Sequence, residues 1–283
     1  MTTRTLAIIA LLLTVSVAWA CSDTAARPRG RDVILPTMRP TSPPQGGLYI
    51  ALGDSLSAGI GASDASTTFV GLVHASLGPS VALENLGVPG ATSQDLIDNG
   101  SLDRAAQEIE QRNRDNDPVN DVQLVTLEIG GNDLLGIYFS LVQTGACPDL
   151  EASLSNPDCT GALHTAYEGF RPNLTSALDR LHDADPALPI MLLTLYNPFD
   201  YLPGIGDLGD LSLEGRPDTP FPDGLNDIIR EVAQGRDGVT VVDVFPLFQD
   251  RSLELVSPDG IHPNDAGYQV MADAVISDLR SAP

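Results

Sequence analysis

Short apolar runs alternate with longer helix-patterned stretches from Gly47 onward, and this alternation limits the folds open to the chain. Strands are predicted over 48–52, 81–83, 122–129, 189–195 and 239–244. Helices are predicted mainly over 68–77, 102–112, 133–142, 163–182, 225–233 and 265–279. Unbroken apolar strands joined through helices are typical of parallel sheets buried on both faces. The sequence therefore predicts one α/β domain with a mainly parallel five-stranded sheet and helices on both faces.

The first 46 residues are predicted to lie outside this domain. Arg4 precedes an apolar run over 6–20 that ends in small residues just before Cys21. Such a run is short for a bilayer span and has the layout of a secretory signal. The next residues are rich in Pro and Arg, a linker composition. The predicted organisation is a signal peptide over 1–20, a linker over 21–46 and a folded domain over 47–283.

Two interpretations of the signal stay open. Ala18 and Ala20 suit ordinary signal-peptidase cleavage, which would release a secreted protein. Small residues followed at once by Cys21 also resemble a bacterial lipobox, although Ala18 stands where lipoboxes usually have Leu. Lipidation of Cys21 would tether the protein to the cell envelope, and the linker composition favours this second interpretation. Both interpretations predict export.

The charge of the chain limits its partners. A net charge of -23, from 38 acidic and 15 basic residues, repels phosphate backbones, so nucleic-acid binding is not expected. A neutral or acyl-bearing small molecule is easier to reconcile with such a surface. The sequence makes no prediction of oligomeric state.

Two cysteines remain in the folded domain, Cys147 and Cys159, on either side of a segment rich in Pro, Asn and Asp. In an oxidising compartment this pattern predicts a disulfide that pins a surface loop. A metal site is the alternative, but no histidine or acidic spacing around the pair supports one.

The segment Gly53-Asp54-Ser55-Leu56 directly follows the first predicted strand. A serine at a strand-to-helix turn has an exposed hydroxyl and a free backbone N–H, because the first N–H groups of a helix lack intrahelical partners. That arrangement suits a nucleophile with its own oxyanion donor. Alternatively, Asp54 and Ser55 simply cap the next helix, and the tripeptide alone does not decide between the two.

A nucleophilic serine needs a base held in the correct tautomer. The chain has four histidines, and three of them, His74, His164 and His182, lie in helical stretches. His262 instead lies in a turn-rich loop after the last strand, three residues beyond Asp259. The Asp259 carboxylate can then accept a hydrogen bond from the imidazole. A purely structural Asp–His hydrogen bond is the alternative.

Two other loops offer hydrogen-bond donors. Asn132, in Gly130-Gly131-Asn132-Asp133 after the third strand, has an uncharged amide suited to an oxyanion, or it caps a helix. Gly90, after the second strand, exposes a backbone N–H to the same site or only makes the turn. Gly87 is a second glycine in that loop, which leaves their relative roles open.

These four blocks follow predicted strands, and open parallel sheets bind ligands at the carboxyl ends of their strands. In this order the blocks strongly resemble the SGNH/GDSL hydrolase family, over about 48–279 as a fold and strictly only in the blocks themselves. The resemblance implies a flavodoxin-like SGNH hydrolase fold for 47–283. The chain has no Gly-x-Ser-x-Gly pentapeptide, which counts against the nucleophile elbow of the α/β-hydrolases.

Carried over residue by residue, the resemblance implies Ser55 as nucleophile, His262 as general acid/base and Asp259 as the residue that orients it. The implied oxyanion hole combines the N–H groups of Ser55 and Gly90 with the Asn132 side chain, and Asp54 and Asp133 would support the loops.

The implied reaction is hydrolysis of carboxylic esters, of lipid-type or simple acyl kind, with no metal or organic cofactor. Cleavage of carbohydrate O-acetyl esters is the alternative within the same chemistry. An exported binding protein without turnover is the alternative of another class. The segments 136–160 and 197–222, the second expected to be a long loop, are expected to form the walls or lid of the substrate pocket.

Overall fold

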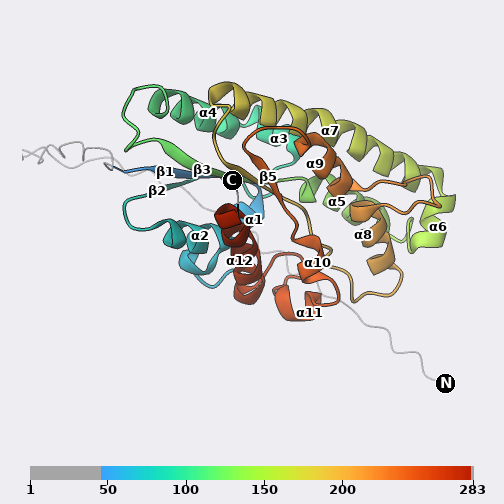
Figure 1. Cartoon of the computed structure of the whole chain (residues 1–283). Helices are drawn as coiled ribbons and strands as arrows, with labels where there is room; N and C mark the ends of the chain where they lie inside the picture. The colour runs from blue at the N-terminus through green and yellow to red at the C-terminus, as the bar shows by residue number, and fades with distance from the viewer. Residues whose placement is uncertain (1–45, 282–283) are drawn as a thin grey trace, which may run out of the picture. The chain divides into compact units, whose positions relative to one another are not determined.

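Five parallel strands form the central sheet of this computed structural model, which describes residues 46–281 (Figure 1). The strands are β1 (Leu48–Gly53), β2 (Ala82–Asn85), β3 (Val122–Glu128), β4 (Ile190–Leu193) and β5 (Val239–Val242). Their order in the sheet is β2-β1-β3-β4-β5, the doubly wound order of flavodoxin-like folds. The predicted fold class is confirmed. The predicted signal peptide and Cys21 lie outside the described residues.

Alternate residues of β1 enter two different cores, because successive side chains of a strand point to opposite faces. Ile50 and Leu52 pack with α3 (Ser93–Asp98), α4 (Ser101–Arg112), α7 (Pro157–Ala184) and α9 (Leu225–Ala233). Tyr49 and Ala51 pack with α2 (Phe69–Leu77) and α12 (Asp265–Ser281). Figure 1 shows these two groups of helices on opposite faces of the sheet. Both faces are therefore covered, as predicted.

Two helices lie inside segments that were predicted to be irregular. The segment 197–222 contains α8 (Ile205–Glu214), so its prediction as a long loop was wrong. Its many glycines and aspartates are typical of a loop, but Leu208 and Leu211 lie three residues apart and form an apolar face of the helix. The other helix, α6 (Leu150–Ser155), begins where the Asp149 side chain accepts from the N–H of Ala152.

The helix predicted over 133–142 begins slightly earlier and changes form along its length. It consists of α5 (Gly131–Ile137) and a π-helical turn, η2 (Tyr138–Val142). Helix α7 also begins before its predicted start, because Asn156 caps it and Pro157 suits a first helical turn. The remaining elements are short and belong to the loops: α1 (Ser55–Ala58), η1 (Ala65–Thr67), α10 (Phe245–Phe248) and α11 (Ser252–Leu255). None of the described helices has the length and apolar character needed to span a membrane.

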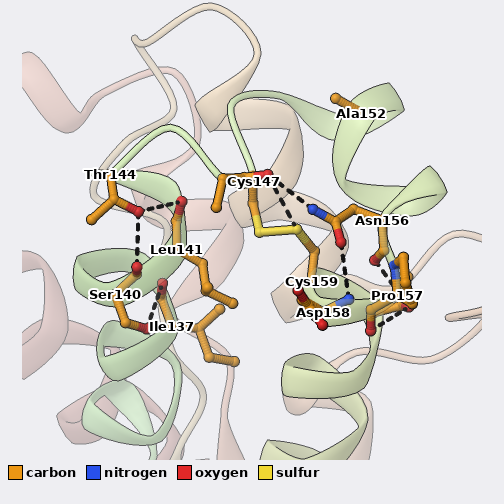
Figure 2. The surroundings of a disulfide bond; sticks show 12 residues. Ile137, Ser140, Leu141, Thr144, Cys147, Ala152, Asn156, Pro157, Asp158 and Cys159 are labelled. Atoms are coloured by element: carbon orange, nitrogen blue, oxygen red, sulfur yellow. Dashed lines mark hydrogen bonds between the residues drawn. A yellow bond between two sulfur atoms is a disulfide. The ribbon is translucent and has the colours of Figure 1, made fainter.

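Cys147 and Cys159 are joined by the predicted disulfide (Figure 2). The bond links the chain just after η2 to the first turn of α7 and encloses α6. The Asn156 side chain donates to the Ala146 carbonyl within the same loop, at 3.1 Å. This loop is therefore held at both of its ends.

Candidate active site

The turn after β1 presents Ser55 at the carboxyl end of the sheet. Gly53 has φ +142°, and a Cβ there would lie 2.0 Å from the carbonyl oxygen of Glu128, so the turn requires glycine. Asp54 caps α1 by accepting from the Leu56 N–H at 3.0 Å. Ser55 is the first residue of that short helix, and its own N–H donates to no other described residue. The capping interpretation therefore holds for Asp54, and the nucleophile role of Ser55 stays a prediction.

Ser55, His262 and Asp259 form one hydrogen-bonded chain. The Ser55 Oγ lies 2.9 Å from Nε2 of His262 and 3.4 Å from Oδ1 of Asp54. The other ring nitrogen of His262, Nδ1, lies 2.7 Å from Oδ2 of Asp259. With Nδ1–H donating to the carboxylate, Nε2 is free to accept the serine proton. The loop before α12 thus brings the two residues to the turn after β1, 207 positions away in the sequence.

The Asp259 carboxylate is held in place by its own loop. Its Oδ1 accepts from the backbone N–H groups of Ile261 and His262, each at 2.9 Å. Burial raises the pKa of Asp259, but these two backbone hydrogen bonds and the one from the His262 ring outweigh it and lower the pKa to about 2. Asp259 is therefore ionised at neutral pH, which fixes the tautomer of His262.

Of the two glycines after β2, Gly90 is the one with a free donor. The N–H of Gly87 donates to Oδ1 of Asn85 at 2.9 Å. Gly90 has φ +81°, and its N–H has no acceptor within the described part of the chain. A Cβ on Gly90 would meet nothing within 4 Å, so its surroundings are open. Gly90 therefore has an N–H available to a ligand, and its role as an oxyanion donor stays a prediction.

The Asn132 amide lies against the turns after β1 and β2 and already donates to two acceptors there. Its Nδ2 donates to Oδ2 of Asp54 at 3.0 Å and to the Ala91 carbonyl at 2.9 Å. As an oxyanion donor, Asn132 must therefore share one of these hydrogens with the substrate. The same two bonds tie together the turns after β1, β2 and β3.

Replacing Asn132 with alanine is expected to lower kcat by about 10²–10³, the cost of one oxyanion donor. Steady-state kinetics on a p-nitrophenyl ester would measure it. Asn173→Ala, which removes an amide that donates to Ser93 instead, is the matched control. A rate close to that of the wild type for Asn132→Ala would exclude the amide from the site.

Asp133 supports the site from α5, as predicted. It accepts from the N–H of Ser93 at 2.9 Å and from the Ser93 hydroxyl at 2.6 Å. Ser93, a plausible cap for helix α3 by its residue type, is not the cap. Thr92 is the cap of α3, because its side chain accepts from the Asp95 N–H, while the Ser93 hydroxyl is taken by Asp133.

Glu128, the last residue of β3, is a buried acid that the sequence prediction missed. It is 1% exposed, and its neighbouring carboxyl is that of Asp54, which is 2% exposed. No described residue donates a hydrogen bond to either Glu128 oxygen. Burial first, and the negative charge of Asp54 second, raise the pKa of Glu128 well above its ordinary value. Folded Glu128 therefore keeps its proton to higher pH than an exposed glutamate does.

The raised pKa of Glu128 predicts how the stability of the fold depends on pH. Unfolded Glu loses its proton near pH 4.3, whereas folded Glu128 keeps it to higher pH, so stability falls as the pH rises above about 4.3. Glu128→Gln removes that dependence, because the amide does not titrate. We expect the variant to match the wild type at pH 4 and to raise Tm at pH 7 by about 2–4 °C, the shift that ~1 kcal/mol produces in a domain of this size.

Thermal unfolding followed by circular dichroism at pH 4, 5.5 and 7 would measure this difference. Glu168→Gln, at an exposed position of α7, controls for the loss of a surface charge. A difference in Tm that does not change with pH would contradict the raised pKa of Glu128.

An apolar pocket opens beside Ser55 and has a volume of about 140 Å³. It is lined by Ser55 and Asn132 at the site and by side chains from both segments that were predicted to wall it. From these segments they include Ile137, Tyr138, Leu154, Leu208 and Phe221, and Leu163 of α7 also lines the pocket. Neither His262 nor Gly90 lines it.

A doubly wound parallel sheet with a Ser–His–Asp hydrogen-bonded chain at its carboxyl edge has the fold and site of a hydrolase. The model of the GDSL-like lipase/acylhydrolase family matches residues 51–270, and the chain belongs to that family. The family predicted from the four sequence blocks is thus confirmed.

Individual relatives agree with this assignment. The spore germination lipase LipC of Bacillus licheniformis is 25% identical over 233 residues, which cover 80% of this chain and 92% of that protein. The lipase Lip_vut3 from a goat rumen metagenome has the same fold, with a TM-score of 0.58 and 20% identity over 81% of this chain and 96% of that one. Phospholipase A1 from Streptomyces albidoflavus NA297 has a TM-score of 0.52 and 23% identity, over 82% and 99%.

Proposed function

We propose that this protein hydrolyses carboxylic esters of lipid-type or simple acyl kind, with Ser55 as nucleophile. The observation that carries the proposal is the hydrogen-bonded chain from Ser55 through His262 to Asp259, at the mouth of an apolar pocket. A serine within 2.9 Å of an oriented imidazole is the arrangement that activates a hydroxyl.

The proposed reaction has two halves. Ser55 Oγ attacks the ester carbonyl carbon while Nε2 of His262 takes the hydroxyl proton. The tetrahedral intermediate collapses as His262 gives this proton to the leaving alcohol, and Ser55 is left acylated. A water molecule then gives its proton to His262 and attacks the acyl carbon, which releases the acid and restores the Ser55 hydroxyl.

Charge on the carbonyl oxygen develops near three donors. The N–H groups of Ser55 and Gly90 are free to bind it, and the Asn132 amide joins them by sharing a hydrogen. Asp259 remains ionised throughout and stabilises the imidazolium that forms at each proton transfer. The chain thus supplies a candidate residue for every step of ester hydrolysis.

Lipid-type or simple acyl esters are favoured by the apolar lining of the pocket. An acetyl group on a polysaccharide would leave most of that lining without a partner. The Bacillus licheniformis relative is a lipase, which agrees with an acyl ester substrate. An exported binding protein without turnover would not need a serine hydrogen-bonded to an oriented imidazole.

The test combines a fluorophosphonate probe with hydrolysis of p-nitrophenyl esters by the purified protein. We expect labelling of Ser55 and turnover of the esters. Ser76→Ala, which changes an exposed serine on α2, should behave as the wild type. No labelling together with no turnover would favour the binding protein, and turnover confined to acetyl esters would favour the acetyl esterase.

We also propose that the protein is exported and that Cys21 is the anchor of a lipoprotein. The support is the apolar run over 6–20, the cysteine that follows it and the Pro- and Arg-rich composition of 21–46. Fractionation of cells that express the full chain is the test. The wild type is expected in the membrane fraction and Cys21→Ser outside it. Release of both proteins to the medium would favour ordinary secretion.

A further inference from the structure

We propose that the apolar pocket holds the acyl chain of the ester, and that helix α6, pinned by the Cys147–Cys159 disulfide, forms its far end. The disulfide then sets the longest acyl chain that the enzyme accepts. This inference rests on the proposed ester hydrolysis. It adds which part of the ester the pocket binds, how the ester is oriented, and which helix limits the length of the acyl chain.

The position of His262 decides which part of the ester enters the pocket. The leaving oxygen must lie next to His262, because this residue protonates it. Ser55 and Asn132 line the pocket, whereas His262 does not. The alcohol part therefore lies on the His262 side, outside the pocket. The other substituent of the carbonyl carbon, the acyl chain, is left to enter the pocket.

The pocket extends from the site along α5 and η2. These helical segments run from Gly131, beside the site, to Val142. Cys147 and Cys159 line the pocket, as do Ser153 and Leu154 of α6. Since the disulfide follows the end of η2, these residues mark the end of the pocket that is far from Ser55.

The lining chemistry fits a hydrocarbon chain. Two apolar clusters outside the main cores form the walls, one around Val142 and the disulfide and the other around Leu163, Leu211 and Phe221. An engineered cavity of about 150 Å³ in another protein binds benzene, so a cavity volume near 140 Å³ corresponds to about six carbon atoms. We therefore expect a preference for acyl chains of medium length, near octanoate.

The disulfide holds the far end in place. Helix α6 has only six residues, too few for a stable helix by itself, and the bond closes the 12-residue separation that contains it. Both sulfur-bearing side chains are buried, Cys147 at 1% and Cys159 at 6% exposed. Without the bond, α6 is free to move away from the pocket, which opens its end to longer chains.

The first experiment varies one side of the ester at a time. We expect kcat/KM of the wild type on p-nitrophenyl esters to rise about three- to fourfold per acyl methylene from acetate to about octanoate, and to fall towards palmitate. Alkyl acetates with alcohols from ethyl to hexadecyl should show no such optimum. An optimum in the alcohol series with a flat acyl series would overturn the orientation.

The second experiment removes the disulfide. In Cys147→Ala/Cys159→Ala, the ratio of kcat/KM for palmitate to that for octanoate should rise at least tenfold. Leu253→Ala, an exposed position on α11, should keep the wild-type ratio. An unchanged ratio in the folded double variant would overturn the role of the disulfide. If the double variant does not fold, Leu154→Trp offers a second test, because the larger side chain fills the far end of the pocket. The ratio of kcat/KM for octanoate to that for acetate should then fall at least tenfold. An unchanged ratio would overturn the proposal.

Failure of this inference and failure of the proposed function give different results. Ester turnover with no dependence on acyl length would overturn the acyl pocket and leave the hydrolase standing. Absence of turnover on every ester, together with no fluorophosphonate labelling of Ser55, would overturn the hydrolase and the acyl pocket with it.

Discussion

Replacing Ser55 with alanine is expected to lower kcat on p-nitrophenyl esters by about 10⁶. Losses of this size follow removal of the nucleophile in serine hydrolases of known mechanism. The reason lies in the site itself, because among the described residues Ser55 supplies the only hydroxyl that contacts Nε2 of His262. The Ser55 N–H remains in the variant, so a small residual rate from the oxyanion donors is expected.

Because Ser55 and His262 are joined by this hydrogen bond, the losses of kcat caused by replacing each of them are not expected to add. His262→Ala should cost about as much as Ser55→Ala, and the double variant should cost no more than either single one, because residues that act as a unit fail together. Single-turnover kinetics on the three variants would measure this. Two additive losses would show that Ser55 and His262 act in separate steps.

The second large effect is expected for Asp259→Asn, about 10⁴ in kcat. The variant keeps an oxygen for the backbone N–H groups of Ile261 and His262, but its amide donates to Nδ1. The imidazole is then held in the opposite tautomer, with Nε2 protonated and unable to accept from Ser55. KM should change little, because Asp259 does not line the pocket.

Steady-state kinetics and thermal unfolding of Asp259→Asn would separate this effect from misfolding. Asp273→Asn, at an exposed position of α12, is the matched control. A pH profile adds a further check. Because the pKa of Asp259 is about 2, the carboxylate stays charged well below pH 4, so the acid limb of the wild-type profile should not report its protonation. A loss below tenfold would remove Asp259 from the triad.

The sequence predicts the sheet well because strands such as β1 and β4 are continuous apolar runs with both faces buried. In β1, every residue from Leu48 to Leu52 is hydrophobic, and so short a hydrophobic run is typical of a buried strand in a parallel sheet. The geometry of Ser55, Asp259 and His262 was also predictable in outline. All three lie in turns at the carboxyl edge of the sheet, where the chain order of the strands brings them together.

Other features depend on contacts that a linear pattern does not contain. The raised pKa of Glu128 arises from its burial and from the Asp54 carboxyl beside it, and both depend on the folded structure, although an acid within a strand is a usable signal. Thr92 and Ser93 are equally good capping residues, and the position of Asp133 decides between them. Helix α8 was missed because glycine and aspartate lower its propensity, whereas its packing on the pocket stabilises it.

The apolar clusters that wall the pocket share only a few side chains, such as Leu134 and Tyr167, with the large core on one face of the sheet. Their segments are inserted after β3 and after β4, whereas Ser55 and His262 belong to the ends of the domain. Chemistry and substrate range are thus encoded in different parts of the gene. Exchange of these two insertions between relatives offers a route by which evolution, or a designer, can change the preferred ester while the reaction stays the same.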